Sequence, residues 1–241
     1  MKRREFLTSV AALGVASSLP IAKAETVQGG QPWEPGKINT PPAPRKGGLQ
    51  YLTQHEFDTV GAIAERFIPA DALSISGKEA GCAIFIDRQL AGDYGSAAAV
   101  YRLGRFVKGT PEQGPQSPLT PAQRYRQGLA ALDAYTNKKF SQTFVALSGD
   151  QQDELLRRME ANQLDLGPDV ETKVFFELLL QNVREGFLSD PLYGGNKEMA
   201  SWKMIGFPGA RYDYRPYIER HNEDLHLEPI SIAQWKGRDK P

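Results

Sequence analysis

The chain has 241 residues, with 29 lysine and arginine residues against 29 aspartate and glutamate residues, and a single cysteine, Cys82. This length suits one sizeable core, and the balanced charge provides no basic patch for nucleic acid. One cysteine cannot form a disulfide within the chain or supply a cysteine-ligated iron–sulfur cluster or zinc site. We expect Cys82 to be either a buried inert thiol or a bridge to another chain.

The first 24 residues have the three parts of an export signal. A basic start precedes an apolar stretch, Thr8–Leu19, which is too short and too rich in small residues to span a bilayer. An A-x-A cleavage site then ends at Ala24, so we expect the mature chain to begin at Glu25. Cleavage would remove four basic residues and one acidic residue, leaving 217 residues with a net charge of −3.

The basic start of this signal has a distinctive spacing. It contains the pair Arg3 and Arg4. Phe6 and Leu7 follow at the spacing of a twin-arginine signal rather than a general secretory one. The twin-arginine translocase carries proteins that are already folded, commonly with a cofactor inserted in the cytoplasm. We therefore predict a periplasmic protein that folds, alone or with a partner, before it crosses the membrane.

Two extended arms flank the predicted helical domain. Residues 25–50 are rich in proline and glycine and have no period, which predicts an arm rather than a helix. Trp33 in the middle of this arm is unusual for a solvated linker, and we expect it to anchor the arm on this domain or on a partner. Residues 51–217 carry the helical pattern, and residues 218–241 form a second, polar and irregular arm.

The helical pattern begins with a capping box. Thr53 and Glu56 have the spacing at which a hydroxyl and a carboxylate each satisfy a free backbone N–H. An apolar stripe at helical spacing follows, and it ends before Pro69. A second helix, which carries the cysteine, is predicted for residues 80–90, and a third for residues 96–107.

Three further helices are predicted downstream. Thr120 and Gln123 cap a helix that runs to about Phe140. Residues 150–159 follow another capping signal, and residues 169–187 form the most apolar helix, which we place centrally. No run of period-two alternation is long enough for a sheet. The predicted fold class is therefore mostly α, a single irregular helical domain with extended N- and C-terminal arms.

The glycine and serine patterns offer little that predicts catalysis. The chain has neither the glycine fingerprint of a dinucleotide site after a strand nor the Gly-x-Ser-x-Gly of a nucleophilic serine. Gly194, Gly195 and Asn196 precede a short helix and could hold an anion. A turn that needs positive φ is the favoured interpretation of these residues.

The histidines give no clear site either. His55 lies in the first turn of the first predicted helix, where we expect it to be exposed. His221 and His226 lie among three acidic residues in a segment that could bind a metal. Their five-residue spacing does not place both imidazoles on one helix face, so we predict a solvated tail. We assign no catalytic, cofactor-binding or metal-ligating residue to this chain.

The segment Asp190–Ala210 is long, aromatic and rich in glycine, whereas loops that only connect helices are usually short. It could be an active-site loop, a cofactor cradle or a surface for another protein. Protein interfaces favour aromatic residues, methionine and arginine. The predicted partner contacts are Trp33, Cys82, Tyr193, Trp202, Phe207, Arg211, Tyr212, Tyr214 and Tyr217. The alternative, packing against the chain's own helices, is plausible for Trp202 and Phe207.

These segments resemble a known family. The export signal, the helix Phe57–Asp71, the run Phe175–Asn196 and the segment Ser201–Ala210 are similar to the gluconate 2-dehydrogenase subunit 3 family. Its members are the small or gamma subunits of bacterial flavin-dependent sugar and sugar-acid dehydrogenases. The likeness covers roughly Leu52–Tyr217. Its most specific element is the pairing of DPxYGGN with WxxIGFPGA.

The resemblance implies a role and a set of partners. The family's catalytic subunit is a separate GMC-type flavoprotein that carries FAD and lacks its own export signal. The small subunit supplies the twin-arginine signal and stabilises that partner, and a c-type cytochrome subunit with haem c often passes electrons to the membrane quinone pool. The resemblance thus implies a periplasmic protein that reaches the membrane only through its partners and holds neither cofactor itself. The small subunit has no established catalytic residues to transfer to this chain.

Two alternatives remain open. The chain could be a transient export chaperone for the same flavoprotein, or a stand-alone periplasmic enzyme that uses the Tyr193–Asn196 loop. Such an enzyme needs a base and a nucleophile or cofactor near that loop, where Asp190, Tyr193 and Lys197 are the candidates. Stable co-purification with a flavoprotein from the periplasm would distinguish a subunit from a chaperone.

Overall fold

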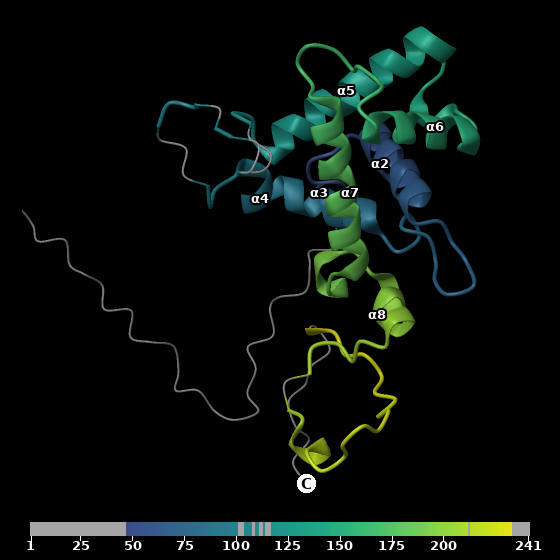
Figure 1. Ribbon diagram of the computed structural model, residues 1–241, viewed down its shortest axis with the longest axis vertical. Helices are drawn as coiled ribbons and strands as arrows, with labels where there is room; N and C mark the ends of the chain where they lie inside the picture. The colour runs from purple at the N-terminus through teal and green to yellow at the C-terminus, as the bar shows by residue number, and fades with distance from the viewer. Residues whose placement is uncertain are drawn as a thin grey trace, which may run out of the picture. The chain divides into compact units, whose positions relative to one another are not determined.

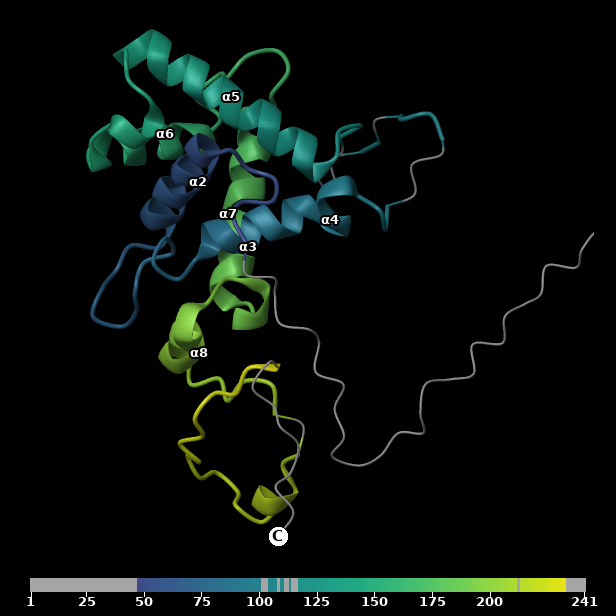
Figure 2. The same cartoon turned by 180° about the vertical axis from the view of Figure 1, so that it is seen from behind.

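The computed structural model describes residues 47–100, 104–107, 109–110, 113, 117–211 and 213–232, all within one compact unit. These residues contain seven α-helices and no strand (Figures 1 and 2), which confirms the mostly α prediction. Their one β pairing is an isolated bridge between Gly209 and Ile230. The predicted signal and interface residues that lie outside these ranges are Arg3, Arg4, Phe6, Leu7, Ala24, Trp33 and Tyr212.

The helices are separated by connections of very different length, from one residue between α3 and α4 to residues 97–120 between α4 and α5. They are α2 (Gln54–Phe67), α3 (Cys82–Ala91), α4 (Asp93–Ser96), α5 (Pro121–Phe140), α6 (Gly149–Glu160), α7 (Thr172–Leu188) and α8 (Ala200–Ile205). Single 3-10 turns occur at Phe144–Ala146, Pro191–Tyr193, Lys197–Met199 and Arg215–Tyr217. Five of the six predicted helices are therefore present with small changes in their bounds.

Capping boxes fix three of these helix starts. Thr53, Thr120 and Ser148 each accept a hydrogen bond from the backbone N–H three residues later. The side chain of the Glu or Gln at that third position accepts a hydrogen bond from the backbone N–H of the capping residue. Each cap contributes about 1 kcal/mol. The signals were visible in sequence because every atom involved lies within four residues.

The helix predicted for residues 96–107 is wrong. In its place the short helix α4 ends at Ser96, because Ala97 adopts a left-handed conformation with φ of +56°. Residues 97–100 form a turn, and residues 104–107 are not helical. The apolar residues that suggested a buried stripe remain at the surface, with Val100 61% and Val107 76% exposed. Among the described residues, no neighbouring element buries Val100 or Val107, so the pattern lacks the packing that stabilises a helix.

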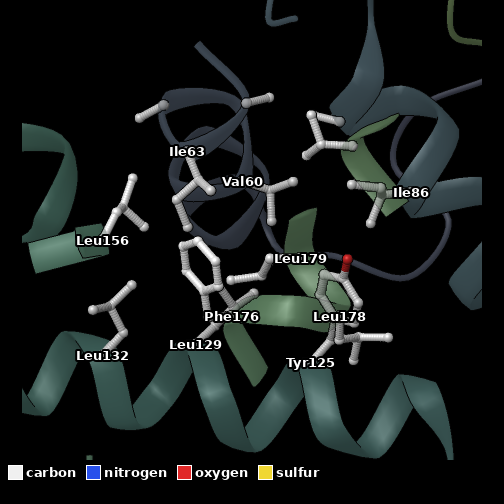
Figure 3. Packing of buried hydrophobic residues seen from close by; sticks show 14 of the residues in the cluster. Val60, Ile63, Ile86, Tyr125, Leu129, Leu132, Leu156, Phe176, Leu178 and Leu179 are labelled. Carbon is white, nitrogen blue, oxygen red and sulfur yellow. The ribbon is translucent and has the colours of Figure 1, made fainter. Parts of the chain in front are cut away.

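The apolar helix α7 lies at the centre of the core, as its sequence predicts. It packs against α2, α3, α5 and α6 (Figure 1), and its Leu179 and Val183 are fully buried. The ring of Phe176 meets the ring of Phe67 edge to face, with centroids 5.3 Å apart. Figure 3 shows α7 side chains meeting those of the surrounding helices at Val60, Ile63, Ile86, Tyr125, Leu129, Leu132 and Leu156.

One polar cluster is buried within this core. The hydroxyls of Tyr94 and Tyr125 both donate to Oδ1 of Asn182, at 3.1 and 3.0 Å. Nδ2 of Asn182 donates in turn to Glu185 at 2.9 Å. Burial raises the pKa of both tyrosines, so the two hydroxyls keep their protons and remain donors. The cluster ties α4 and α5 to α7 through hydrogen-bonded polar groups.

A second buried polar group holds the chain where it enters α2. The Asp87 carboxylate on α3 is 3% exposed. It accepts the backbone N–H groups of Gln50, Tyr51 and Leu52, at 2.7, 2.9 and 2.8 Å. This carboxylate therefore attaches the end of the N-terminal arm to the helical core.

A glycine sets the spacing between α5 and α7. A Cβ on Gly128 would lie 2.4 Å from the ring of Phe175, so the two helices approach more closely than an alanine allows. The ring of Phe175 also meets Tyr125 edge to face, with centroids 6.1 Å apart. Gly61 on α2 differs, since its nearest neighbour would be Lys78 Cγ at 3.7 Å, an ordinary contact.

These two glycines yield opposite predictions. Gly128→Ala gains about 1 kcal/mol of helix propensity but creates a clash that costs about 1–3 kcal/mol, so we expect the melting temperature to fall. Gly61→Ala gains the same propensity without a clash, so we expect it to rise by a few degrees. Thermal unfolding followed by circular dichroism measures both. Equal stabilisation by both substitutions would contradict the close packing of α5 on α7.

Candidate partner interface

A buried carboxylate organises the segment that follows α7. Asp190 is 7% exposed and accepts the backbone N–H of Leu192 at 2.9 Å. It also accepts the Ser231 hydroxyl at 2.7 Å and the backbone N–H of Ile232 at 2.8 Å. One side chain thus joins the start of the DPLYGGN run to residues about 40 positions later.

A backbone bridge closes the same connection. Ala210 N–H donates to the Ile230 carbonyl at 2.7 Å, and Ile230 N–H donates to the Pro208 carbonyl at 3.3 Å. Gly209 has φ of +76°, and a Cβ there would lie 2.3 Å from the Ile230 carbonyl oxygen. Residues 211–229, which we call the tail loop, therefore leave and return at one place. Most described residues of the tail loop are exposed.

The two glycines of the YGGN run are explained by close packing. Gly194 has φ of +106°, and a Cβ there would lie 2.6 Å from Nη1 of Arg88. A Cβ on Gly195 would lie 2.0 Å from the carbonyl oxygen of Gly186 on α7. The chain's own atoms thus occupy the space that a cofactor phosphate would need beside these glycines. This packing favours the turn over the anion cradle.

Asn196 completes the turn from the inside. Its side chain is fully buried, with φ of +46°. Nδ2 donates to the Ser189 carbonyl at 2.9 Å, and Oδ1 accepts the backbone N–H of Ser201 at 2.9 Å. Asn196 therefore connects the end of α7 to the start of α8 and is occupied with structural hydrogen bonds.

The segment from Asp190 to Ala210 is partly helical rather than one long loop. It contains α8, on which Trp202 is 6% exposed and donates its indole N–H to the Leu188 carbonyl at 2.9 Å. The ring of Phe207 meets Trp202 edge to face, with centroids 5.1 Å apart. Trp202 thus anchors α8 to α7, and Phe207 covers it from outside.

The arrangement spans the segments on which the family resemblance rests. A model of the family described as Gluconate 2-dehydrogenase subunit 3 matches residues 54–209, from the first residue of α2 to the bridge at Gly209. The chain belongs to the gluconate 2-dehydrogenase subunit 3 family. Membership implies a subunit of such a dehydrogenase complex. Comparisons with curated proteins and with solved structures gave no match.

By their exposure, the predicted contact residues that the structure describes fall into three groups. Cys82 and Trp202 lie inside the subunit's own core, so they offer little surface to another chain. Tyr193, Phe207 and Tyr214 are 45%, 44% and 42% exposed. Those with intermediate exposure are Arg211 and Tyr217. That these exposed residues contact another chain remains a prediction.

Two further apolar side chains of α8 are exposed: Met204, which the sequence already places among the interface-type residues of this segment, and Ile205, which the sequence analysis did not select. Met204 and Ile205 at the end of α8 are 40% and 56% exposed and lie next to Phe207 in the chain. We call Met204, Ile205 and Phe207 the α8 patch. Their exposure follows from Trp202, which takes the inward face of this short helix, and the helical period could have indicated it.

The described residues offer no evident metal site. Nowhere among them do three or more His, Cys, Asp or Glu side chains come together as metal ligands would. His226 lies in the exposed tail loop, with Nδ1 3.4 Å from Asp224. His55 is 47% exposed and bonds Asp133 through Nε2 at 2.6 Å. No described helix combines the length and hydrophobicity that crossing a bilayer requires.

Asp190 should control the base of the tail loop. In Asp190→Asn, an amide N–H₂ replaces the oxygen that accepts the Ile232 N–H, leaving a partly buried donor without its acceptor. We expect limited proteolysis to cleave the tail loop at least several times faster in this variant. Asp224→Asn, at a side chain 75% exposed within the loop, is the matched control and should change nothing. Equal cleavage of both variants would contradict the role of Asp190.

Cys82 should be unreactive in the folded subunit. Its side chain is fully buried, and burial raises the pKa of its thiol to about 12, so almost no thiolate forms near neutral pH. We expect no labelling by iodoacetamide at pH 8 until denaturant is added. Non-reducing gels should show no band at the summed mass of this chain and a partner chain. Such a band would restore the bridge between chains.

Proposed function

We propose that this chain is the non-catalytic small subunit of a periplasmic flavin-dependent sugar or sugar-acid dehydrogenase complex. In this role it carries the twin-arginine signal and escorts and stabilises the FAD-containing catalytic subunit. The observation that carries the proposal is the family match over residues 54–209 in a chain that begins with Arg3, Arg4, Phe6 and Leu7 in a twin-arginine pattern. The twin-arginine route carries proteins that are already folded, and family membership implies a flavoprotein partner for this chain.

The packing of the YGGN run supports a non-catalytic role. A stand-alone enzyme would use Asp190, Tyr193 or Lys197 beside this run. Asp190 instead accepts three hydrogen bonds from the chain itself, and Gly195 lies against the backbone of α7. Tyr193 and Lys197 are exposed at this run, but Asp190, the one carboxylate among the three candidates, is buried and occupied by the chain's own donors, so it is not available as a base.

The surface near this segment suits contact with another protein. The α8 patch places three exposed apolar side chains within four residues at the end of α8. The tail loop adds Tyr214 and Tyr217, held at a fixed base by Asp190 and the bridge at Gly209. Long loops with closed ends are commonly functional, and aromatic side chains dominate interface energetics. We propose that this surface contacts a GMC-type flavoprotein, with a c-type cytochrome as a third subunit.

In this proposal the cofactors belong to the partners. FAD would be bound by the catalytic subunit and haem c by the cytochrome. The complex would be periplasmic and would associate with the inner membrane through those partners. The twin-arginine translocase would be a transient partner of residues 1–24.

The escort role is tested by the signal itself. In Arg3→Lys with Arg4→Lys, positive charge is kept but the paired arginines are lost, so we expect both this chain and the flavoprotein to remain in the cytoplasm. Immunodetection and flavin-dependent dye reduction in periplasmic and cytoplasmic fractions measure this. Lys2→Arg is the matched control and should export normally. Partner activity that still reaches the periplasm would contradict the escort role.

A further inference from the structure

The turn that leads into α8 contains a concentration of left-handed backbone. Asn196, Glu198 and Met199 have φ of +46°, +57° and +58°. Among the described residues other than glycine, no other four consecutive positions contain three such angles, and only Glu198 and Met199 are adjacent. Asparagine tolerates this region, whereas it is unfavourable for glutamate and methionine. We call residues 196–199 the left-handed turn.

The sequence of this turn favours a different conformation. Lysine, glutamate, methionine and alanine, which occupy positions 197–200, are among the strongest helix formers. Asn196 is of a residue type preferred at the N-cap, and Glu198 would place an acid in the first helical turn. The local sequence therefore predicts one continuous helix through α8, but Glu198 and Met199 interrupt it. Such a conflict between local preference and fold marks strained and functional sites.

The ends of the left-handed turn, rather than its own side chains, hold it in this conformation. The backbone N–H of Lys197 donates to the Ala80 carbonyl at 3.0 Å. The buried side chain of Asn196 accepts the backbone N–H of Ser201. The Glu198 side chain is exposed and forms no hydrogen bond or ion pair with another described residue. The strain is therefore imposed by the attachments on either side of the turn.

A buried hydroxyl beside the turn lacks a partner. The side chain of Ser201 is fully buried, and its Oγ makes no hydrogen bond within the described part of the chain. In a helix, a serine hydroxyl can donate to the carbonyl four residues earlier, which for Ser201 is the carbonyl of Lys197. A continuous helix would therefore satisfy a group that the left-handed turn leaves unpaired.

Building on the proposed function, we propose that the left-handed turn is a hinge with two states. In the free chain the turn is left-handed. In the complex with the flavoprotein, Glu198 and Met199 become right-handed, so that α8 begins at Lys197, Asn196 caps it, and the Ser201 hydroxyl gains its acceptor. The flavoprotein causes this change by binding α8 better in its new position, since a ligand shifts an equilibrium only through a difference in affinity.

The attachment of α8 explains why the free chain does not make this change by itself. Rotation at Glu198 and Met199 moves α8 relative to α7, so Trp202 would leave its buried position and lose its hydrogen bond to the Leu188 carbonyl. Contacts with the flavoprotein must offset that loss. Relief of the backbone strain makes the offset smaller, so the position of α8 depends on the partner.

Glycine substitution distinguishes this hinge from a rigid turn. Glycine adopts positive φ without the penalty of other residues, and it is a poorer helix former than alanine. It therefore stabilises the left-handed state and disfavours the helical one. In a rigid turn, which is left-handed in both the free chain and the complex, glycine stabilises both equally and leaves the affinity unchanged.

The first test compares Met199→Gly with Met199→Ala, which both remove the methionine side chain. We expect the glycine variant to melt at the higher temperature by circular dichroism, because the free chain has positive φ at this residue. In binding titrations with the flavoprotein that co-purifies with the mature chain, we expect its dissociation constant to be at least about fivefold higher, the ratio set by helix propensity. Glu198→Gly and Glu198→Ala should differ in the same way.

Ser141 provides the matched control. It follows the end of α5 with φ of +55°, and its side chain is exposed. A left-handed residue at this place is ordinary helix-end geometry. Ser141→Gly should therefore also melt at a higher temperature than Ser141→Ala. Because this site lies outside the hinge, the two dissociation constants should agree within about twofold.

The second test uses the buried hydroxyl. Ser201→Ala removes a group that has no partner in the free chain, so the melting temperature should not fall. In the complex the same substitution removes a hydrogen bond, so the dissociation constant should rise about fivefold. A rigid turn predicts no change in affinity for this variant.

The outcomes separate the two proposals. Equal dissociation constants for the glycine and alanine variants at Glu198 and Met199 would overturn the hinge alone and keep the subunit role. Glycine variants that melt no higher than the alanine variants would also overturn the hinge, since the turn would then carry no strain. A wild-type chain that binds no flavoprotein would overturn both proposals. Weaker binding of the glycine variants at the turn, with no change at Ser141, would support both.

Discussion

The architecture of the described residues depends on buried carboxylates that each accept several hydrogen bonds. Asp87 holds the backbone of residues 50–52 against α3, and Asp190 holds residues 231 and 232 against the end of α7. A buried charge is costly unless donors surround it, and hydrogen bonds to a charged group are worth about 1.5–3 kcal/mol each. Both ends of the described chain are thus attached to the helical core by polar contacts, while the core itself is apolar apart from the cluster around Asn182.

This division of roles leaves distinct surfaces for other molecules. Within the core, glycines allow α5 to approach α7 and the YGGN run to lie on α7, so these motifs serve packing. Outside it, the α8 patch and the tail loop are exposed on a firmly held base. Motifs packed inside the chain and apolar side chains left exposed at the surface are expected of a subunit in a larger complex.

Local signals in the sequence predicted the helices well, whereas contacts between distant residues could not be predicted. The capping boxes at Thr53 and Thr120 involve atoms within four residues, and the structure confirms them. The contact of Asp190 with Ser231 joins residues 41 positions apart, and no local pattern marks it. The prediction of a helix at residues 96–107 is wrong for the same reason. An apolar period in the sequence does not show whether a neighbouring element exists to bury those side chains. The exposure of Tyr193 and Phe207, and the burial of Trp202 and Cys82, likewise follow from packing rather than from composition.

The central claim is that this chain is a stable partner of a flavoprotein, and one measurement tests it most directly. The mature chain is captured from the periplasm under non-denaturing conditions, and the eluate is examined by gel and by absorption spectroscopy. The account predicts a second polypeptide in a fixed ratio with the absorption of bound flavin. A colourless, monomeric chain would contradict it.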